Sequence, residues 1–287
     1  MSLFAVLTYA KPVTLAATGE TLGQRAGIVN IGLEGMVLSS SFVAVVVTER
    51  TGSMAFGITA ALVVALMLGT LQLLFTLRLA ADQVVVGTAI NLFSFGATSA
   101  LYRQIYGQTG SLITIKGLPP ILGELDLLTL CTLVLVAAAG WVLAKTPWGL
   151  RVRATGELPK AVDAAGLSAL KTRWQAGLIA AAFAGLAGAH LGLGVTRTFI
   201  ENMSGGIGFL AIAMVTFGRW RPLLVMAAGV LLYLAQERQF ALQAAGVKLP
   251  QQLFNAAPYL VALLVLIIVG KGSRAPASLG QPYTPTQ

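Results

Sequence analysis

The chain has 287 residues, of which 56% are hydrophobic and only 10% are charged, and its mean hydropathy is +0.82. A soluble domain carries roughly 25% charged residues, so the composition excludes a water-soluble globule and indicates an integral membrane protein with many spans. The net charge of +9 would favour nucleic-acid binding in a soluble chain. In a membrane protein it indicates basic cytoplasmic loops, so we expect the lipid bilayer and no nucleic acid as a partner.

Nine segments are candidate membrane spans. A bilayer core about 30 Å thick needs roughly 20 apolar residues per helix. Five segments are long enough and contain no Asp, Glu, Lys or Arg: residues 54–77, 83–102, 127–144, 174–196 and 249–270. These five are the clear spans.

The other four segments are weaker spans. Residues 1–19 contain Lys11 next to a proline, residues 27–48 contain Glu34, residues 202–218 begin near two glycines, and residues 222–236 are only 15 residues long. Such segments are expected to be broken, half-spanning or extended by flanking residues, which is tolerated where the backbone is packed in protein or lines a cavity. The sequence therefore predicts an all-α polytopic membrane protein of about 8–9 transmembrane helices, some of them broken or short.

The orientation follows from the polar segment 145–173, which carries six Lys or Arg residues against two acids. This excess of basic residues places it in the cytoplasm. Counting crossings in both directions assigns the other loops: inside are 78–82, 219–221 and 271–274, and outside are 49–52, 103–126, 197–201 and 237–248. The C-terminus falls inside, and the Pro-, Ser- and Gly-rich residues 271–287 are expected to form a disordered cytoplasmic tail.

Within the polar segment, residues 159–165 are predicted to form a short helix. Pro159 suits its first turn and Gly166 suits its C-terminal stop. The helix is too short and polar to span a membrane. It could dock into a groove on a soluble partner, and the alternative is a simple connecting loop.

Several motifs resemble one transporter family. Residues 149–167 (GLRVRATGELPKAVDAAGL) and 23–36 (GQRAGIVNIGLEGM), followed by matching pieces in the family's order, resemble ABC importer permeases of the branched-chain amino acid, ribose and nucleoside family. The similarity is greatest to the short permeases of the nucleoside and simple-sugar type. Val162 stands where the family usually has alanine and Leu167 where it has isoleucine, and both are small departures.

The resemblance implies that residues 1–270 form the transmembrane permease domain of an ATP-driven importer, with residues 145–173 as its cytoplasmic coupling segment. The positions assigned to ATPase coupling are Ala154, Gly156, Glu157, Pro159, Ala161, Ala164, Ala165 and Gly166. The implied partners are an ATP-binding cassette ATPase, a second homologous permease in a heterodimer, and an extracytoplasmic substrate-binding protein, all at the cytoplasmic (inner) membrane of a prokaryote. The chain has no G-x-x-x-x-G-K-[ST] loop, so ATP and Mg²⁺ would be bound by the ATPase and this chain needs no cofactor.

Candidates for the substrate pathway are polar or aromatic residues: Asn30, Glu34, Gln83, Asn91, Phe93 and Phe209. An ionisable side chain at membrane depth is costly and usually faces a cavity or a partner, which for Glu34 could be Arg25. Glu34 is therefore either a pathway residue or a structural one, and the structural interpretation is favoured. The amides could contact a nucleobase or sugar, and the rings could stack on a base, although interhelical hydrogen bonds or packing explain each of them singly.

Two other functions can be weighed against the importer. The spans contain one histidine, one cysteine and almost no acids, so neither catalytic residues nor a metal site are expected, and the chain is not predicted to be an enzyme. An ion-coupled secondary carrier of small polar solutes is the alternative function. That class often places carboxylates at mid-membrane, and the five clear spans contain none.

Overall fold

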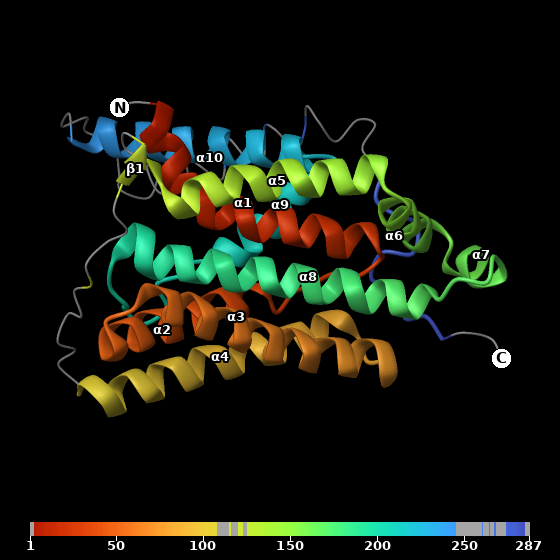
Figure 1. Ribbon diagram of the computed structural model, residues 1–287, viewed down its shortest axis with the longest axis horizontal. Coiled ribbons are helices and arrows are strands. Elements are labelled where there is room, and N and C mark those ends of the chain that lie inside the picture. The colour runs from red at the N-terminus through yellow and green to blue at the C-terminus, as the bar shows by residue number, and fades with distance from the viewer. Residues whose placement is uncertain are drawn as a thin grey trace.

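The computed structural model describes residues 3–107, 115, 120–122, 125–244, 260, 264, 267 and 274–284. Its long helices run side by side along one axis (Figure 1). In chain order they are α1 (Leu3–Arg25), α2 (Leu33–Thr51), α3 (Met54–Leu73), η1 (Leu74–Arg78), α4 (Gln83–Tyr106), α5 (Leu127–Lys145), α6 (Pro147–Glu157), α7 (Pro159–Ala164), α8 (Ala169–Ala189), η2 (His190–Thr196), α9 (Ile207–Phe217) and α10 (Pro222–Ala244). The two η elements are π-helical turns that continue α3 and α8. Strands β1 (Pro120–Leu122) and β2 (Leu125–Asp126) pair as a small antiparallel hairpin.

Four helical segments are long and apolar enough to cross a membrane. They are Met54–Arg78, Gln83–Tyr106, Leu128–Lys145 and Ala169–Thr196. These segments confirm four of the five clear spans predicted from the sequence. Nearly all of the fifth, residues 249–270, lies outside the described residues, and the total of 8–9 crossings stays a prediction.

The weaker spans show each of the expected irregularities. Helix α1 continues through Pro12 to Arg25, beyond the predicted end at residue 19. Helix α2 begins only at Leu33, after a non-helical stretch that starts near Gly27. Helix α9 has 11 residues, which is about 16 Å and half the thickness of a bilayer core, whereas α10 is lengthened to 23 residues by polar residues beyond its apolar part.

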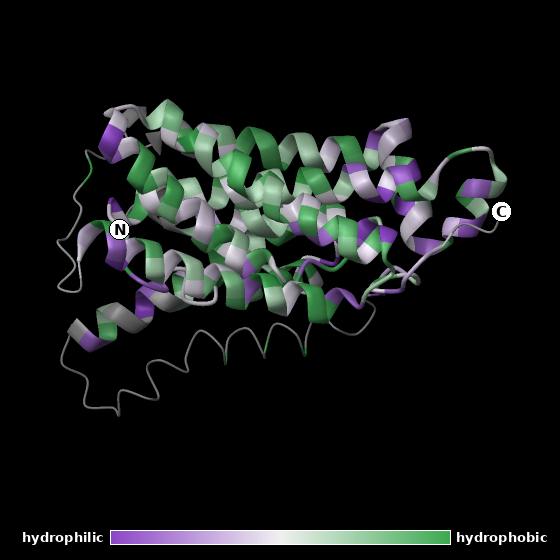
Figure 2. Cartoon of the chain, turned by 90° about the horizontal axis from the view of Figure 1, so that it is seen from below, coloured by the Kyte–Doolittle hydropathy of each residue, from purple (hydrophilic) through white to green (hydrophobic). Residues whose placement is uncertain are grey.

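The described loops lie at the two ends of the bundle, and which end faces the cytoplasm stays a prediction. At one end lie α6, α7 and residues 274–284 (Figure 1), and there the Arg25 side chain at the end of α1 donates a hydrogen bond to the carbonyl of Trp220. At the other end, Arg103 pairs with Glu201 at 2.9 Å. Hydrophilic residues concentrate at these ends, with a largely hydrophobic middle between them (Figure 2).

Close packing of small residues holds the centre of the bundle. Helix α8 packs against α1, α2 and α3, and a methyl group added at Gly188 would lie 2.4 Å from the backbone oxygen of Val37. Without a hydrophobic force between helices in lipid, such close approach is the main source of helix association. The glycine- and alanine-rich part of α8 is therefore buried among the other helices.

The expected disorder of residues 271–287 is wrong for residues 274–284, which we call the C-terminal segment. Ser278 is buried, its amide donates to the carbonyl of Gly156 at 2.8 Å, and the amide of Gly280 donates to the carbonyl of Gly27 at 3.1 Å. A Pro-, Ser- and Gly-rich stretch has little apolar surface to bury. Hydrogen bonds to residues 27 and 156 hold the C-terminal segment in place instead.

Candidate functional sites: a coupling surface and a polar junction

Local sequence signals determine where α6 and α7, the two short helices after α5, begin and end. Helix α6 begins after Thr146, whose hydroxyl accepts a hydrogen bond from the amide of Gly149 at 3.1 Å, and it has Pro147 in its first turn. Helix α7 begins at Pro159 and ends at Ala164, and the chain turns away at Gly166, which has a φ of +78°. The structure therefore confirms the short helix that was predicted over residues 159–165.

Six of the eight residues assigned to coupling are exposed, and three of them lie on an exposed apolar surface. Leu158 is 57% exposed and Leu167 is 42% exposed. They lie with the exposed alanines of α7 and its C-terminal end, and together they form what we call the coupling surface: Leu158, Ala161, Ala164, Ala165 and Leu167. Ala154, Glu157 and Gly166 are also exposed. An apolar face on a short projecting helix is suited to packing into a groove of another protein.

Two of the assigned coupling residues are buried inside the chain. Pro159 is buried at the start of α7, and Gly156 is buried near the end of α6. A methyl group at Gly156 would lie 2.2 Å from the backbone oxygen of Arg25. Glycine is thus required there for the contact between α6 and α1, and neither residue is available to touch a partner in this structure.

The C-terminal segment ties the coupling end of the bundle together through Arg173. This side chain is fully buried, and its guanidinium donates to the carbonyl of Ala26 at 3.1 Å, to that of Gln281 at 3.0 Å and to the hydroxyl of Ser278 at 3.1 Å. The Ser278 hydroxyl in turn donates to the carbonyl of Gly156 at 2.7 Å. The sequence pattern had counted Arg173 only as a positive loop charge, because nothing near it in the chain indicates these distant partners.

Tyr283 extends this connection to α7. Its hydroxyl donates to the carboxylate of Asp163, and the guanidinium of Arg173 lies 5.7 Å from the centre of its ring. The hydrogen bond to Asp163 raises the pKa of Tyr283 above its ordinary value. The other carboxylate oxygen of Asp163 accepts from the amide of Ala169 at 2.8 Å, so one acid links the C-terminal segment, α7 and the start of α8.

Glu34 holds the beginning of the half-length helix α9. Its carboxylate accepts hydrogen bonds from the Ser204 hydroxyl at 2.6 Å and from the amides of Gly206 and Gly208 at 2.8 and 2.6 Å. The first amides of a helix have no partner within the helix and favour a negative charge. The suggested pair with Arg25 is wrong, because Arg25 donates to the backbone of Trp220 instead.

The two polar candidates on α4 hold the non-helical backbone before α2. The side-chain oxygen of Gln83 accepts from the amide of Val29 at 2.7 Å. Asn91 accepts from the amide of Gly35 at 2.8 Å and donates to the carbonyl of Ile31 at 2.8 Å. Irregular backbone at membrane depth needs such partners, because no water is available in the lipid core.

Four of the six pathway candidates therefore meet in one place. Asn30 belongs to the same non-helical stretch before α2, and its backbone amide donates a hydrogen bond to the Glu20 carboxylate at 3.0 Å. We call this region the polar junction, meaning the side chains of Asn30, Glu34, Gln83 and Asn91 with backbone residues 27–35. All four side chains are at most 6% exposed.

The two aromatic candidates lie elsewhere. Phe93 is 64% exposed and Phe209 is 49% exposed on the surface of this chain. The structure therefore does not bring them together with the buried polar junction.

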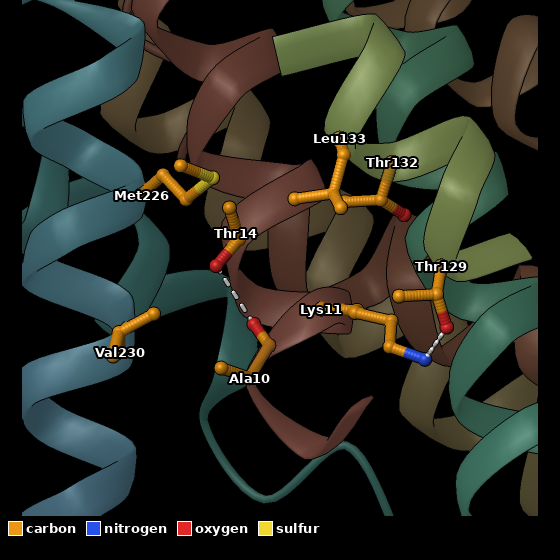
Figure 3. A pocket seen from close by; sticks show the side chains of 8 residues that line it. All are labelled: Ala10, Lys11, Thr14, Thr129, Thr132, Leu133, Met226 and Val230. Carbon is orange, nitrogen blue, oxygen red and sulfur yellow. Dashed lines mark hydrogen bonds between the residues drawn. The ribbon is translucent and has the colours of Figure 1, made fainter. Parts of the chain in front are cut away.

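A small pocket between α1, α5 and α10 contains a buried lysine that the sequence reasoning did not select (Figure 3). Lys11 is 3% exposed and donates to the hydroxyl of Thr129, while Met226 and Val230 form the opposite wall. A lysine inside an apolar segment usually faces the protein interior or a cavity. This was the available signal, but Lys11 had been treated only as weakening the first span.

These features define a class of protein. The bundle combines membrane-length helices with a half-length helix and buried irregular backbone. This combination is typical of polytopic membrane transport proteins. Residues 2–270 match the family described as the branched-chain amino acid transport system / permease component. The chain therefore belongs to this family of multi-pass membrane permeases, which are transporter subunits and not enzymes.

Individual relatives agree with the family match. The guanosine ABC transporter permease protein NupQ of Bacillus subtilis is 31% identical over 97% of this chain and 95% of NupQ. The nucleoside ABC transporter permease protein NupC of Lactococcus lactis is 28% identical over 97% of this chain and 95% of NupC. A second guanosine permease protein of Bacillus subtilis, NupP, is 28% identical over 77% of this chain and 68% of NupP. No solved structure matches the chain. The resemblance drawn from the motifs is confirmed.

Proposed function

We propose that this chain is the transmembrane permease subunit of an ATP-binding cassette importer for nucleosides or a related simple sugar. The observation that carries the proposal is the family match over residues 2–270. Nucleosides are the favoured substrate class because the relatives NupQ and NupC are named as guanosine and nucleoside permeases. The family match also disfavours the ion-coupled carrier as an alternative.

The energy for transport would come from a separate ATPase that binds ATP and Mg²⁺. Its nucleotide-driven movement would reach this chain at the coupling surface on α7. Arg173 and the C-terminal segment connect the coupling end to the ends of α1 and α6, so a displacement of α7 would be passed to these helices as a unit.

The coupling end would face the cytoplasm of a prokaryotic cell, with the chain in the cytoplasmic membrane. The clustering of Lys145, Arg151, Arg153, Lys160 and Lys171 along residues 145–173 supports this orientation, because basic residues concentrate in cytoplasmic loops. The C-terminus would then be cytoplasmic as well.

A second homologous permease would complete the pathway, and an extracytoplasmic binding protein would deliver the substrate. The presence of two guanosine permease proteins in Bacillus subtilis, both similar to this chain, supports a heterodimer. The exposed rings of Phe93 and Phe209 would line the pathway from the surface between the two permeases. Asn30, Glu34, Gln83 and Asn91 would shape it indirectly by holding the backbone.

The test is co-purification of the tagged chain from native membranes in mild detergent, with mass spectrometry of the bound proteins. We expect an ATP-binding cassette subunit and a second permease. Repeated isolation of the well-folded chain alone would contradict the proposal. The co-purified binding protein can then be titrated with nucleosides and simple sugars to decide the substrate class.

One matched pair of variants tests the coupling surface itself. Ala161→Arg places a large charge on the exposed face of α7, and Ala241→Arg places the same charge on exposed α10 near the opposite end. We expect the Ala161→Arg variant to co-purify with the second permease but not with the ATPase. The Ala241→Arg variant should co-purify with both. Equal ATPase recovery with the two variants would contradict docking at α7.

A further inference from the structure

A second pocket lies beside the polar junction, where α1, α3 and α8 meet the non-helical residues before α2. Its polar lining consists of Glu20, Asn30 and Gln72, which are 0%, 6% and 2% exposed. Its volume of about 10 Å³ is enough for one water molecule or one small ion. None of the functions derived above uses Glu20 or Gln72.

Each of these three side chains has one oxygen atom without a hydrogen-bond donor among the described residues. Glu20 Oε1 accepts one hydrogen bond from the Gln24 side chain at 2.9 Å and one from the backbone amide of Asn30 at 3.0 Å. Glu20 Oε2, Asn30 Oδ1 and Gln72 Oε1 have no partner among the described residues. The NH₂ groups of both amides point elsewhere, to the sulfur of Met36 at 3.4 Å and to the carbonyl of Val29 at 3.5 Å. A water molecule has two hydrogens, so it could satisfy only two of the three oxygens.

In its ionised form, Glu20 would also carry an unbalanced charge. No lysine or arginine in the part of the chain that the structure describes pairs with it. The buried Arg173 donates to the carbonyl of Ala26 and to the C-terminal segment, and the buried Lys11 donates to Thr129. A carboxylate buried in a membrane protein is strongly disfavoured without a positive partner.

We propose that this pocket binds one monovalent cation of the size of Na⁺, coordinated by Glu20 Oε2, Asn30 Oδ1 and Gln72 Oε1. A hard cation takes oxygen ligands and would satisfy the three acceptors and the charge together. One carboxylate balances one positive charge, whereas a divalent ion such as Ca²⁺ requires six to eight oxygen ligands, usually with several carboxylates. The ion would fasten the non-helical backbone to α1 and α3, and its binding does not depend on the transported substrate.

The experiment measures thermal unfolding of the purified full-length chain, with any subunits that co-purify, in NaCl, KCl or choline chloride at equal ionic strength. A ligand that binds only the folded state raises Tm with its concentration. We expect Na⁺ at saturation to raise Tm by roughly 5 °C over choline, and binding of radioactive ²²Na⁺ to saturate at one ion per chain. An identical Tm in the three salts would overturn the proposal and would indicate a protonated Glu20.

Two variants locate the site. Glu20→Gln removes the charge with little change in shape and should abolish both the Tm response and ²²Na⁺ binding. Thr76→Val is the control, because Thr76 is buried on the same side of the bundle, does not line the pocket and donates only to the carbonyl of Gln72 within its own helical segment. It should keep the full response. A response that persists in Glu20→Gln would overturn the assignment, and if that variant does not fold, the salt comparison and ²²Na⁺ binding on the unaltered chain still decide.

Discussion

The coupling end and the polar junction both use buried polar side chains to bind backbone groups, but only the coupling end also presents an exposed surface. At the coupling end, buried Arg173 and Ser278 bind backbone carbonyls, while α7 leaves an apolar surface exposed. At the polar junction, Glu34 and Asn91 are buried and bonded to backbone amides and carbonyls. Where water is absent, polar side chains must satisfy the backbone first. Of these two regions, only the coupling end has an exposed surface, the apolar one on α7, that a partner protein could contact.

This difference predicts that changes in the polar junction affect folding, whereas changes on the coupling surface affect assembly. The following variants are ordered from the largest expected effect on stability to the smallest.

Glu34→Ala should be the most damaging. It leaves the amides of Gly206 and Gly208 and the hydroxyl of Ser204 buried without an acceptor, which costs about 3–5 kcal/mol. Thermal unfolding in detergent should show a Tm lower by roughly 10 °C. The control is Glu157→Ala at the exposed coupling end, which should change Tm little. Equal losses in the two variants would contradict the contrast between the regions.

Gly188→Leu should destabilise the bundle by about 1–3 kcal/mol, because the added side chain meets the backbone of Val37 and overpacks the interface between α8 and α2. Gly96→Leu makes the same change on α4, where an added methyl group meets nothing within 4 Å. Its unfolding temperature should stay close to that of the unaltered chain. A wild-type Tm for Gly188→Leu would refute the close contact.

Ser278→Ala should cost about 1 kcal/mol, the usual contribution of a buried hydrogen bond. The Arg173 guanidinium keeps its carbonyl acceptors, while the carbonyl of Gly156 loses the hydroxyl donor. We expect a small drop in Tm and faster proteolysis after residue 273. Unchanged proteolysis would mean that this hydroxyl does not hold the C-terminal segment in place.

Tyr283→Phe should have the smallest effect, about 0.5 kcal/mol or less, because Tyr283 is only half-buried. The ring can still lie against Arg173, and only the hydrogen bond to Asp163 is lost. Chemical unfolding of the purified chain would measure the difference. A loss as large as that of Glu34→Ala would show that the coupling end is as tightly constrained as the junction.

Much of the architecture could be predicted because it depends on local properties. Hydropathy averaged over roughly 20 residues identifies a span, so residues 54–77 and 174–196 were recognised as helices. Pro159 and Gly166 marked the ends of α7, since a first-turn proline and a terminal glycine act through their own backbone geometry. The family likewise followed from motifs readable along the chain.

The tertiary structure alone decided how the polar residues are used. Glu34 and Gly208 are 174 residues apart, and Arg173 and Ser278 are 105 apart. No pattern within a helix or loop encodes such pairs, so Glu34 had been matched with nearby Arg25, and residues 271–287 had been expected to be disordered. A hydrogen bond depends on the positions of two atoms in space, and only the packed bundle determines those positions.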